Sequence, residues 1–261
     1  MNGPFETELL VRVEEAGINA SAPREQLWVD GWLVRLSPGK AKRARCIQAV
    51  APGRLSVEAR LKRCLAHYAG VGLRPYVRIT PFSQPPDLDA RLADLGMERI
   101  DDTRVMVASM AELSDVTGDT AIAASDVRFQ PAAATVFAEW IGSQRGSSSA
   151  ERIAHAERLC DAPVRYHGVL VVDPSGATVA GGQVAVEDEF AGLYDIFTVA
   201  SARNRGLART LCRHLLAYAA AQGAGKAYLQ VEASNESARR VYRRLGFEDA
   251  YAYHYRSPPA S

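Results

Sequence analysis

Hydrophobic positions in residues 126–256 follow two alternating spacings, which predict strands and helices in turn. GLYDIFTV at 192–199 is β-branched and aromatic like a strand, whereas LARTLCRHLLAYAAA at 207–221 has apolar residues at helical spacing. We predict strands at 126–130, 164–173, 178–187, 192–199, 226–233 and 248–256. We predict helices at 132–143, 149–160, 205–221 and 235–245, the second opened by a capping box of Ser148 and Glu151. This order indicates an α/β (α+β) fold with a mixed, mostly antiparallel sheet flanked by helices.

The same plan occurs twice along the chain. ARLADLGMERIDDTRVMV (90–107) parallels RRVYRRLGFEDAYAYHYR (239–256), and their Leu-Gly pairs at 95–96 and 245–246 lie 150 positions apart. Upstream, KRCLAHYAGVGLRPYVRIT (62–80) parallels CRHLLAYAAAQGAGKAYLQVE (212–232). An internal repeat of this length predicts two related domains. The small, polar segment 109–126 separates them, so we place the domains at residues 1–115 and 116–261.

The charge balance argues against nucleic acid or a membrane as the partner. Lys and Arg number 31 and Asp and Glu number 30, so no overall field points to a polyanion. The first residues lack the order of a signal peptide, and no run of about 18 apolar residues is present to span a bilayer. We therefore expect a cytoplasmic location. The four cysteines lack CxxC spacing and nearby His clusters, so we expect free thiols and no metal site.

ASARNRGLART, residues 200–210, concentrates positive charge where a predicted strand gives way to a predicted helix. The first amides of a helix have no intrahelical partner, and the helix dipole adds about half a positive charge there. Gly206 would let a ligand approach the backbone closely, and Arg203, Arg205 and Arg209 add charge. The turn therefore suits a phosphate group. A tight βα connection with solvated arginines is the alternative explanation of the same residues.

Two motifs follow one another in TVASARNRGLARTL and AYLQVEASNESARRVYRRLGFEDA. The first has Arg203, Gly206 and Ala208 in the pattern Arg or Gln, two residues, Gly, one residue, Gly or Ala; the second has Asn235, then Tyr242 shortly before Leu-Gly-Phe at 245–247. In both motifs the chain resembles the GNAT superfamily of acyl-CoA-dependent N-acyltransferases. A Walker loop and a dinucleotide fingerprint need glycine patterns that are absent here.

The resemblance implies acetyl-CoA as the co-substrate and assigns segments to it. Its pyrophosphate would accept hydrogen bonds from the loop formed by Arg203, Asn204, Arg205, Gly206, Leu207 and Ala208. Its pantetheine arm would lie as a pseudo-strand beside Ile196, Phe197 and Thr198, because a strand that leaves its neighbour exposes unpaired amides. Asn235 fits a helix N-cap and by resemblance also contacts the coenzyme. The arginines at 239–244 suit either the 3′-phosphate or a solvated helix face.

Transfer of an acyl group to an amine needs a base for the ammonium, a polarised carbonyl and an acid for the thiolate. In the family the acid is typically the tyrosine equivalent to Tyr242, although Tyr242 also shares an apolar helical face and would suit the core. Asp195, on the strand that leads to the loop, and Glu232, at the end of the next strand, are the candidate bases. Each is equally suited to anchor the substrate ammonium or to a structural role, and many family members use water chains instead.

Residues 1–115 depart from this pattern. Counting back 150 positions from the loop places Gly53, Ser56 and Glu58 opposite Arg203, Gly206 and Ala208. A carboxylate at that position would repel pyrophosphate, so we expect a tandem GNAT protein whose N-terminal half is degenerate. That half would wall the substrate cleft, hold the active half or bind an effector. The basic run SPGKAKRAR (37–45) is either a solvated hairpin or a contact for an acidic substrate group.

The sequence thus predicts an enzyme, an N-acetyltransferase that moves an acetyl group from acetyl-CoA to a primary amine of a small molecule by direct transfer. A catalytically silent acyl-CoA-binding sensor and a protein N-acetyltransferase, which needs an open groove, are the alternatives. The expected partners are acetyl-CoA and a small amine. The acceptor, the acyl chain preference and the oligomeric state are not encoded in any motif, because acceptor pockets of the family come from variable helices and loops, here around residues 140–149.

Overall fold

The computed structural model describes residues 5–113 and 127–259, and its strands form one sheet in the order β1-β2-β3-β4-β11-β5-β10-β9-β8-β7-β6. The first half contributes α1 (Thr7–Ala20), β1 (Gln26–Val29), β2 (Trp32–Arg35), η1 (Lys42–Ala44), β3 (Ile47–Gln48), α2 (Val57–Gly70), β4 (Val77–Ile79), α3 (Leu88–Asp94), β5 (Glu98–Ser109) and α4 (Met110–Leu113). The second half contributes β6 (Arg128–Ala132), α5 (Ala134–Gln144), α6 (Ser149–Asp161), β7 (Tyr166–Val172), β8 (Thr178–Glu187), β9 (Phe190–Thr198), η3 (Ala200–Ala202), α7 (Leu207–Ala221), β10 (Lys226–Glu232), α8 (Glu236–Arg244) and β11 (Glu248–Ser257).

The α/β class and the elements predicted for the second half are confirmed. Ser148 and Glu151 form the expected capping box at the start of α6. The helix predicted from residue 205 begins instead at Leu207, because Gly206 is its N-cap and has a left-handed backbone. The domain boundary proposed between residues 115 and 116 lies outside the described residues.

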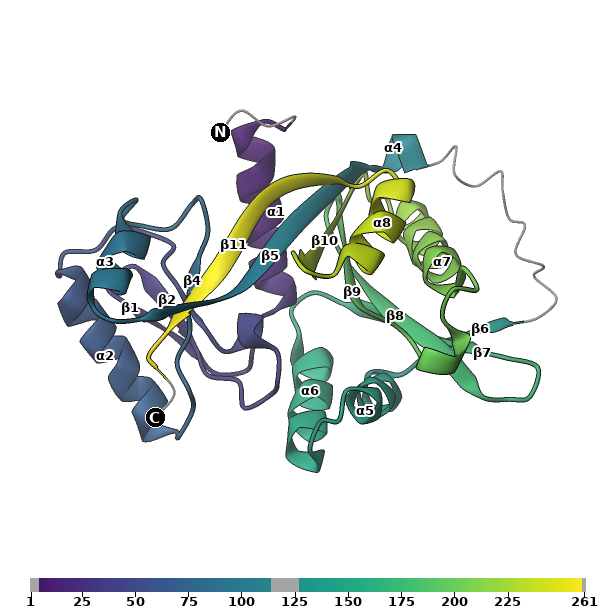
Figure 1. Ribbon diagram of the computed structural model, residues 1–261, viewed down its shortest axis with the longest axis horizontal. Helices are drawn as coiled ribbons and strands as arrows, with labels where there is room; N and C mark the ends of the chain where they lie inside the picture. The colour runs from purple at the N-terminus through teal and green to yellow at the C-terminus, as the bar shows by residue number, and fades with distance from the viewer. Residues whose placement is uncertain (1–4, 114–126, 260–261) are drawn as a thin grey trace.

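The two halves repeat one topology and exchange their last strands. Each half has one parallel pair, β3 with β4 and β9 with β10. In each half the next strand in the sheet comes from the other half, since β11 pairs with β4 and β5 pairs with β10. Strands β5 and β11 also pair with each other, and they cross between the halves as the longest ribbons of Figure 1. The halves therefore share backbone hydrogen bonds and form one continuous sheet.

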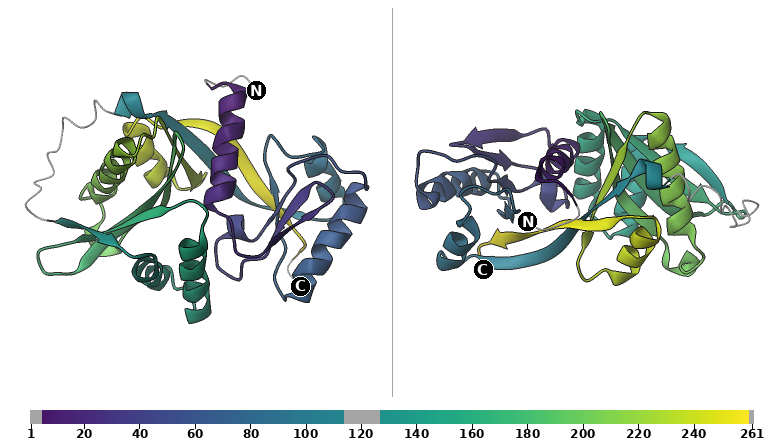
Figure 2. Two further views of the ribbon diagram at one scale, coloured as in Figure 1. Left: turned by 180° about the vertical axis from the view of Figure 1, so that it is seen from behind. Right: turned by 90° about the horizontal axis from the view of Figure 1, so that it is seen from above.

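Three main apolar clusters follow this division. One lies under α7 in the second half and another beneath α2 and α3 in the first. The third lies at the junction, where α1 packs against strands of both halves and buries several tyrosines, among them Tyr194, Tyr228, Tyr251 and Tyr253. The views from the front and from behind place α1 between the halves (Figure 1 and Figure 2). The junction is thus a core in its own right and fixes how the halves face one another.

A buried ion pair lies in this junction. The carboxylate of Glu14 on α1 accepts both terminal nitrogens of Arg78 on β4, one of them at 3.1 Å, and the hydroxyl of Tyr251 on β11 at 2.6 Å. Glu14 is only 7% exposed and Arg78 only 2%. Burying two charges is favourable only where both are paired and hydrogen-bonded, so each partner depends strongly on the other.

We expect Glu14→Gln to lower the free energy of unfolding by about 3 to 5 kcal/mol, because it leaves the buried Arg78 guanidinium without a counter-charge. Urea denaturation followed by circular dichroism measures this change. Glu15→Gln is the matched control, since Glu15 is the next residue of the same helix and is exposed. Equal stability of the two variants would show that the pair contributes nothing to the junction.

Candidate active site

Strands β9 and β10 separate midway along their length, and the cleft opens there. Their parallel pairing ends at Leu193 and Leu229. Beyond that point β9 still pairs with β8, through Phe197 with Gly181 and Thr198 with Ala180. Among the described strands, none pairs with the other edge of residues 196–198. Ile196, Phe197 and Thr198 therefore lie along a strand edge whose backbone groups are available to an extended ligand.

A β-bulge in β9 marks the point of separation. The register with β8 shifts between Gly181 and Gln183, and Asp195 has a positive φ of 53°. Such bulges redirect side chains and are frequent beside active sites. Gly182 lies opposite the bulge, and a Cβ there would lie 2.5 Å from Cδ1 of Ile196, so the Ile196 side chain would have to shift. The bulge turns the Asp195 side chain toward α5 and α6, as its partners show.

The loop after β9 leads into a helix start with no carboxylate on it. Asn204 and Gly206 both have positive φ, 61° and 77°, and an alternation of left- and right-handed residues turns successive amides to one side. No side chain caps α7 and no acidic residue lies in its first turn. Arg203 donates from Nε to the carbonyl of Thr198 at 3.3 Å, which ties the loop to β9, whereas Arg205 is exposed. The loop thus has the features of an anion site of the kind that helix starts provide.

The equivalent loop of the first half is closed by the protein itself. The amides of Arg54 and Leu55 donate to the two carboxylate oxygens of Asp30 at 3.0 and 2.8 Å, which lowers the pKa of that carboxyl. Ser56 caps α2 through the amide of Ala59. A Cβ on Gly53 would lie 2.3 Å from the Asp30 carbonyl oxygen. The Asp30 carboxylate therefore accepts hydrogen bonds from the amides that would otherwise face a phosphate. The positions of Ser56 and Glu58 in the sequence did not reveal this contact.

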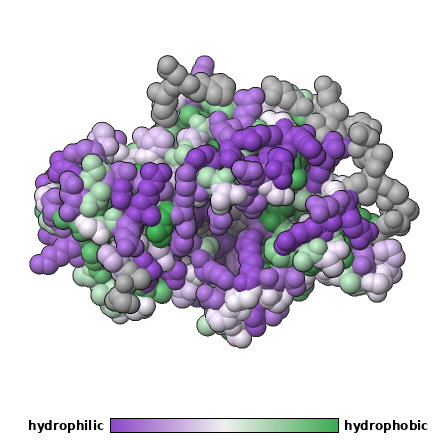
Figure 3. Space-filling view, viewed as in Figure 1, coloured by the Kyte–Doolittle hydropathy of each residue, from purple (hydrophilic) through white to green (hydrophobic). Residues whose placement is uncertain are grey.

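A cleft of about 520 Å³ lies where the halves meet the bulge. The space-filling view shows it as a hollow bordered mainly by hydrophilic residues (Figure 3). Its walls come from residues 37–44 of the first half, from α5 and α6, and from the facing parts of β9, β10 and α8. Asp195, Ile196, Glu232, Asn235 and Tyr242 all line it. The structure thus brings together both candidate bases, the candidate acid and part of the expected coenzyme segment.

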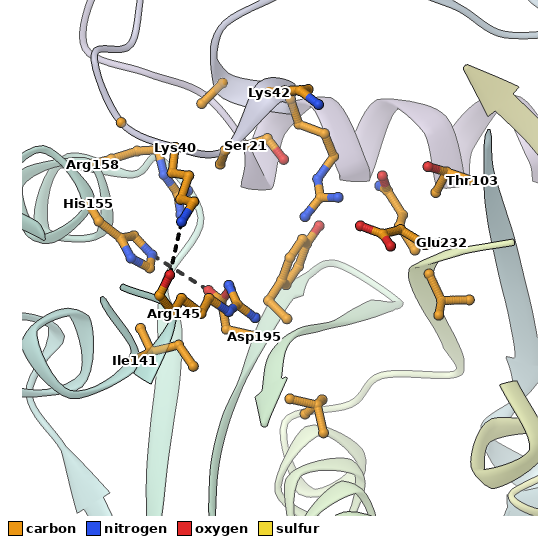
Figure 4. Close-up of a pocket in the computed structure, with 18 of the residues that line it drawn as sticks. Ser21, Lys40, Lys42, Thr103, Ile141, Arg145, His155, Arg158, Asp195 and Glu232 are labelled. Carbon is orange, nitrogen blue, oxygen red and sulfur yellow. Dashed lines mark hydrogen bonds and ion pairs between the residues drawn. The ribbon is translucent and has the colours of Figure 1, made fainter. Parts of the chain in front are cut away.

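Asp195 is held in a positively charged environment. Its carboxylate pairs with Arg145, accepts from Gln183 Nε2 at 3.1 Å and lies 3.5 Å from His155 Nε2 (Figure 4). Burial alone would raise the pKa of Asp195, but the charges of Arg145, His155 and Arg158 outweigh it and hold the pKa well below its usual range. A carboxylate of this kind stays ionised and is a weak proton acceptor.

Tyr242, Asn235 and Glu232 occupy different environments in the same cleft. Tyr242 is buried on α8, and burial raises its pKa above the usual value for a phenol. Asn235 is the N-cap of α8 and accepts from the amide of Ala238 at 3.1 Å. The Glu232 side chain is exposed at the end of β10 and has no hydrogen bond or ion pair with any residue that the structure describes. Its carboxylate is free to meet a ligand.

His155 is a cleft residue that the sequence analysis missed. It lies on α6, its side chain is 18% exposed, and burial followed by the charges of Arg158 and Arg145 lowers its pKa, against the opposing effect of Asp195. Figure 4 shows it on the side of the pocket opposite Glu232. The capping box in the sequence predicted the start of α6. No local signal in the sequence, however, indicates that His155 on this helix lies beside Asp195, 40 residues later.

The remaining arginines of α8 are largely engaged. Arg239 and Arg243 both contact Asp249, at 2.8 and 2.9 Å, and Arg240 pairs with Glu236 on the same helix. Among residues 5–113 and 127–259, no cluster of His, Cys, Asp and Glu is arranged to hold a metal ion. No helix of these ranges has the length and apolar character needed to cross a membrane.

Comparisons with known proteins agree with this geometry. A family model described as "Probable histone acetyltransferase Rv0428c C-terminal" matches residues 8–256. The uncharacterized N-acetyltransferase YobR of Bacillus subtilis (strain 168) is 27% identical over 230 residues, covering 86% of this chain and 89% of YobR. A GCN5-related N-acetyltransferase from Kribbella flavida has a TM-score of 0.68, with 16% identity and coverage of 99% of this chain and 98% of that one. A tandem GNAT protein from the clavulanic acid biosynthesis pathway has a TM-score of 0.61, with 16% identity and coverage of 83% and 76%. The predicted tandem GNAT fold is confirmed.

We expect the protein to bind one acetyl-CoA per chain and Gly206→Val to weaken that binding by at least about tenfold, roughly 1.4 kcal/mol. A side chain at Gly206 would obstruct the loop amides that donate several charge-assisted bonds at once. Isothermal titration calorimetry measures both the stoichiometry and the affinity.

Gly223→Val is the matched control for backbone strain, because Gly223 has a φ of +93° at the other end of α7 and open space around its Cβ position. Unchanged affinity in a folded Gly206→Val variant would contradict the phosphate-loop assignment. Two equivalent sites per chain would contradict the closed loop of the first half.

Proposed function

The chain belongs to the family described as probable histone acetyltransferase Rv0428c, C-terminal, and on that basis we propose that it transfers the acetyl group of acetyl-CoA to a primary amine of a small molecule. That it is an acyltransferase of the GNAT type follows from the family, and GNAT acetyltransferases use acetyl-CoA. One observation carries the proposal: three features adjoin one another. They are the open edge of β9, the uncapped start of α7, and the cleft with Asp195, Glu232 and Tyr242.

In this proposal acetyl-CoA lies across the second half. Its pyrophosphate accepts from the amides of residues 204–208, and its pantetheine arm follows Ile196, Phe197 and Thr198. Asn235, besides capping α8, adjoins the arm from the other side of the separation between β9 and β10. This arrangement would bring the thioester to the β9 bulge, beside the part of the cleft that both halves line.

The reaction is a direct transfer in a ternary complex. The neutral amine attacks the thioester carbonyl carbon, a C–N bond forms, and the C–S bond breaks. The leaving thiolate takes a proton from the hydroxyl of Tyr242, and a base takes the proton that the amine loses. The raised pKa of Tyr242 keeps its hydroxyl protonated at neutral pH, as a general acid requires.

We assign the three acid–base groups of the cleft to different tasks. Glu232 is exposed and unpaired, which suits it to hold the substrate ammonium. Asp195 is already paired and a weak base, so we treat it as a positioning residue for His155. His155 is uncharged at neutral pH because its pKa is lowered, and a neutral imidazole is a better proton acceptor than the paired carboxylate of Asp195. We propose His155 as the base, acting through water molecules in the cleft, because it lies on the side of the pocket opposite Glu232.

Two features favour a small acceptor over a protein. The first half closes one side of the cleft, whereas a peptide needs a groove that continues across the surface. The cleft wall also carries Lys40, Lys42, Arg43 and Arg158, which would repel a lysine-rich tail. The histone substrate in the family's description remains the second candidate. A silent acyl-CoA sensor is the third, and it would not need Tyr242 or His155.

We propose that catalysis resides in residues 116–261 and that residues 1–115 wall the acceptor side. The cytoplasm is the proposed location. All four cysteines are free thiols, three of them buried, which agrees with a reducing compartment.

Replacing Tyr242 with Phe should lower turnover by about 10² to 10⁴, the usual contribution of a general acid, with little change in acetyl-CoA affinity. Thiol release from acetyl-CoA with a panel of amines measures turnover. Tyr218→Phe, on the outer face of α7, is the matched control. Full activity of the Tyr242 variant would place this side chain in the core alone, provided that chemistry limits the rate.

The pH profile should identify the base. Because the neutral form of His155 is the active one, kcat/KM should fall as pH decreases through a pKa below about 6.5. His155→Gln should lose this acidic limb and about 10² or more in rate. Glu232→Gln should keep the limb and raise the KM of the amine. If the limb disappears in the Glu232 variant and persists in the His155 variant, the two assignments must be exchanged.

A further inference from the structure

The junction between the halves contains a group of buried or partly buried arginines. Its guanidinium groups come from β2, the 37–45 segment, β4 and α6; they are Arg35, Arg43, Arg45, Arg78 and Arg158. Glu14 pairs with Arg78 alone. Among residues 5–113 and 127–259 the other four form no ion pair with a carboxylate, although the charge of Arg158 reaches Asp195 and helps to lower its pKa. Nε of Arg43 is buried without a hydrogen bond. Arg35 is only 1% exposed, and burial, with the charges of Arg78 and Arg158, lowers its pKa to about 10.

Two of these arginines, Arg43 and Arg158, line the cleft. The Arg43 guanidinium lies 5.9 Å from the ring of Tyr194, and that of Arg158 lies 5.8 Å from the ring of Tyr166. The two tyrosine rings are 5.4 Å apart, so the arginines flank a common aromatic surface. Arg158 gives one nitrogen to the carbonyl of Ala20 at 3.3 Å. The planar guanidinium groups of Arg43 and Arg158 carry several further N–H donors, an arrangement that suits carboxylate and phosphate groups.

This basic wall adjoins the reacting centre. Tyr194 directly precedes Asp195, and Lys40, beside Arg43 in the same segment, donates to the carbonyl of Arg145 at 2.9 Å. In Figure 4 Lys40, Arg158 and His155 lie on one side of the pocket, and Glu232 lies on the other. A small molecule that bridges the pocket therefore meets the guanidinium of Arg158 at one end and the unpaired carboxylate of Glu232 at the other.

We infer that Arg43 and Arg158 form an anion subsite for the acceptor, and that the acetylated amine therefore carries a carboxylate or a phosphate. The inference rests on the proposed function and narrows its substrate class. Partly desolvated guanidinium groups without an ion-pair partner are costly, and an anionic acceptor would supply that partner. The basic run at 37–45 is accordingly a substrate contact and not a solvated hairpin.

Matched pairs of acceptors test this subsite. At saturating acetyl-CoA, kcat/KM is measured for each anionic amine and for its neutral partner. The carboxylate series compares glycine, β-alanine, 4-aminobutyrate and 6-aminohexanoate with their amides, and the phosphate pair compares phosphoethanolamine with ethanolamine. For at least one pair we expect kcat/KM of the anionic member to exceed that of its neutral partner by about tenfold or more. Preference in the carboxylate series assigns a carboxylate, and preference in the phosphate pair assigns a phosphate.

Variants connect the preference to the arginines. Arg43→Gln should bring the ratio of kcat/KM within the preferred pair close to one, with the affinity for acetyl-CoA unchanged by calorimetry. Arg158→Gln is the second variant, used if the first does not fold by circular dichroism. Arg91→Gln, an exposed arginine on α3, is the matched control and should keep the parental ratio.

The outcomes separate the subsite from the reaction. Equal rates within every pair, or a preference that survives both arginine variants, overturn the subsite and leave acetyl transfer intact. If no amine is acetylated, the proposed function fails, and calorimetry with 6-aminohexanoate and phosphoethanolamine then decides. Binding that is lost in Arg43→Gln supports the anion subsite, and absence of binding to the parent protein overturns it.

Discussion

The backbone pairing of β5 with both β10 and β11 is the interaction on which the rest of the structure depends. Each half alone would end its sheet after the parallel pair, with an open edge at β4 or β10. Exchange of the last strands gives the backbone groups of both edges hydrogen-bond partners from the other half. This matters because unpaired buried backbone groups would be costly. The exchange also fixes the orientation of the halves, so that residues 37–45 of the first half face the bulge of the second.

The active and the inactive loops differ in what occupies their amides. Both follow a strand and precede a long helix, α2 or α7, and both contain a glycine in the motif region. In the first half Asp30 accepts from the loop amides, which makes the anion an internal group. In the second half Gly206 caps α7 without any carboxylate. Duplication thus produced one loop that supports the fold and one that is available to a ligand.

Electrostatics divides the cleft between the two halves. The Asp195 carboxylate is already paired with Arg145 and lies beside His155, so little of its negative charge is available to a substrate on that side of the cleft. Glu232 supplies that charge from β10, while Arg43 and Arg158 leave an excess of positive charge at the junction. The second half carries the residues expected for acyl transfer, and the first half contributes part of the wall of the cleft.

The sequence alone determined the fold class, the duplication and the glycine at the start of α7, because these depend on local patterns: helical spacing around α7, the 150-residue separation of the two Leu-Gly pairs, and Gly206 at a strand-to-helix turn. It also placed Asp195, Glu232 and Tyr242 on elements that the fold brings to one cleft. Only the tertiary structure decided that β5 and β11 cross between the halves, since strand partners depend on contacts between segments far apart in the chain. Likewise, no local pattern encodes the pairing of His155 with Asp195, the closing of the first loop by Asp30, or the unpaired guanidinium groups at the junction. These features arise from side chains that meet only after the two halves have packed, where burial and neighbouring charge set their chemistry.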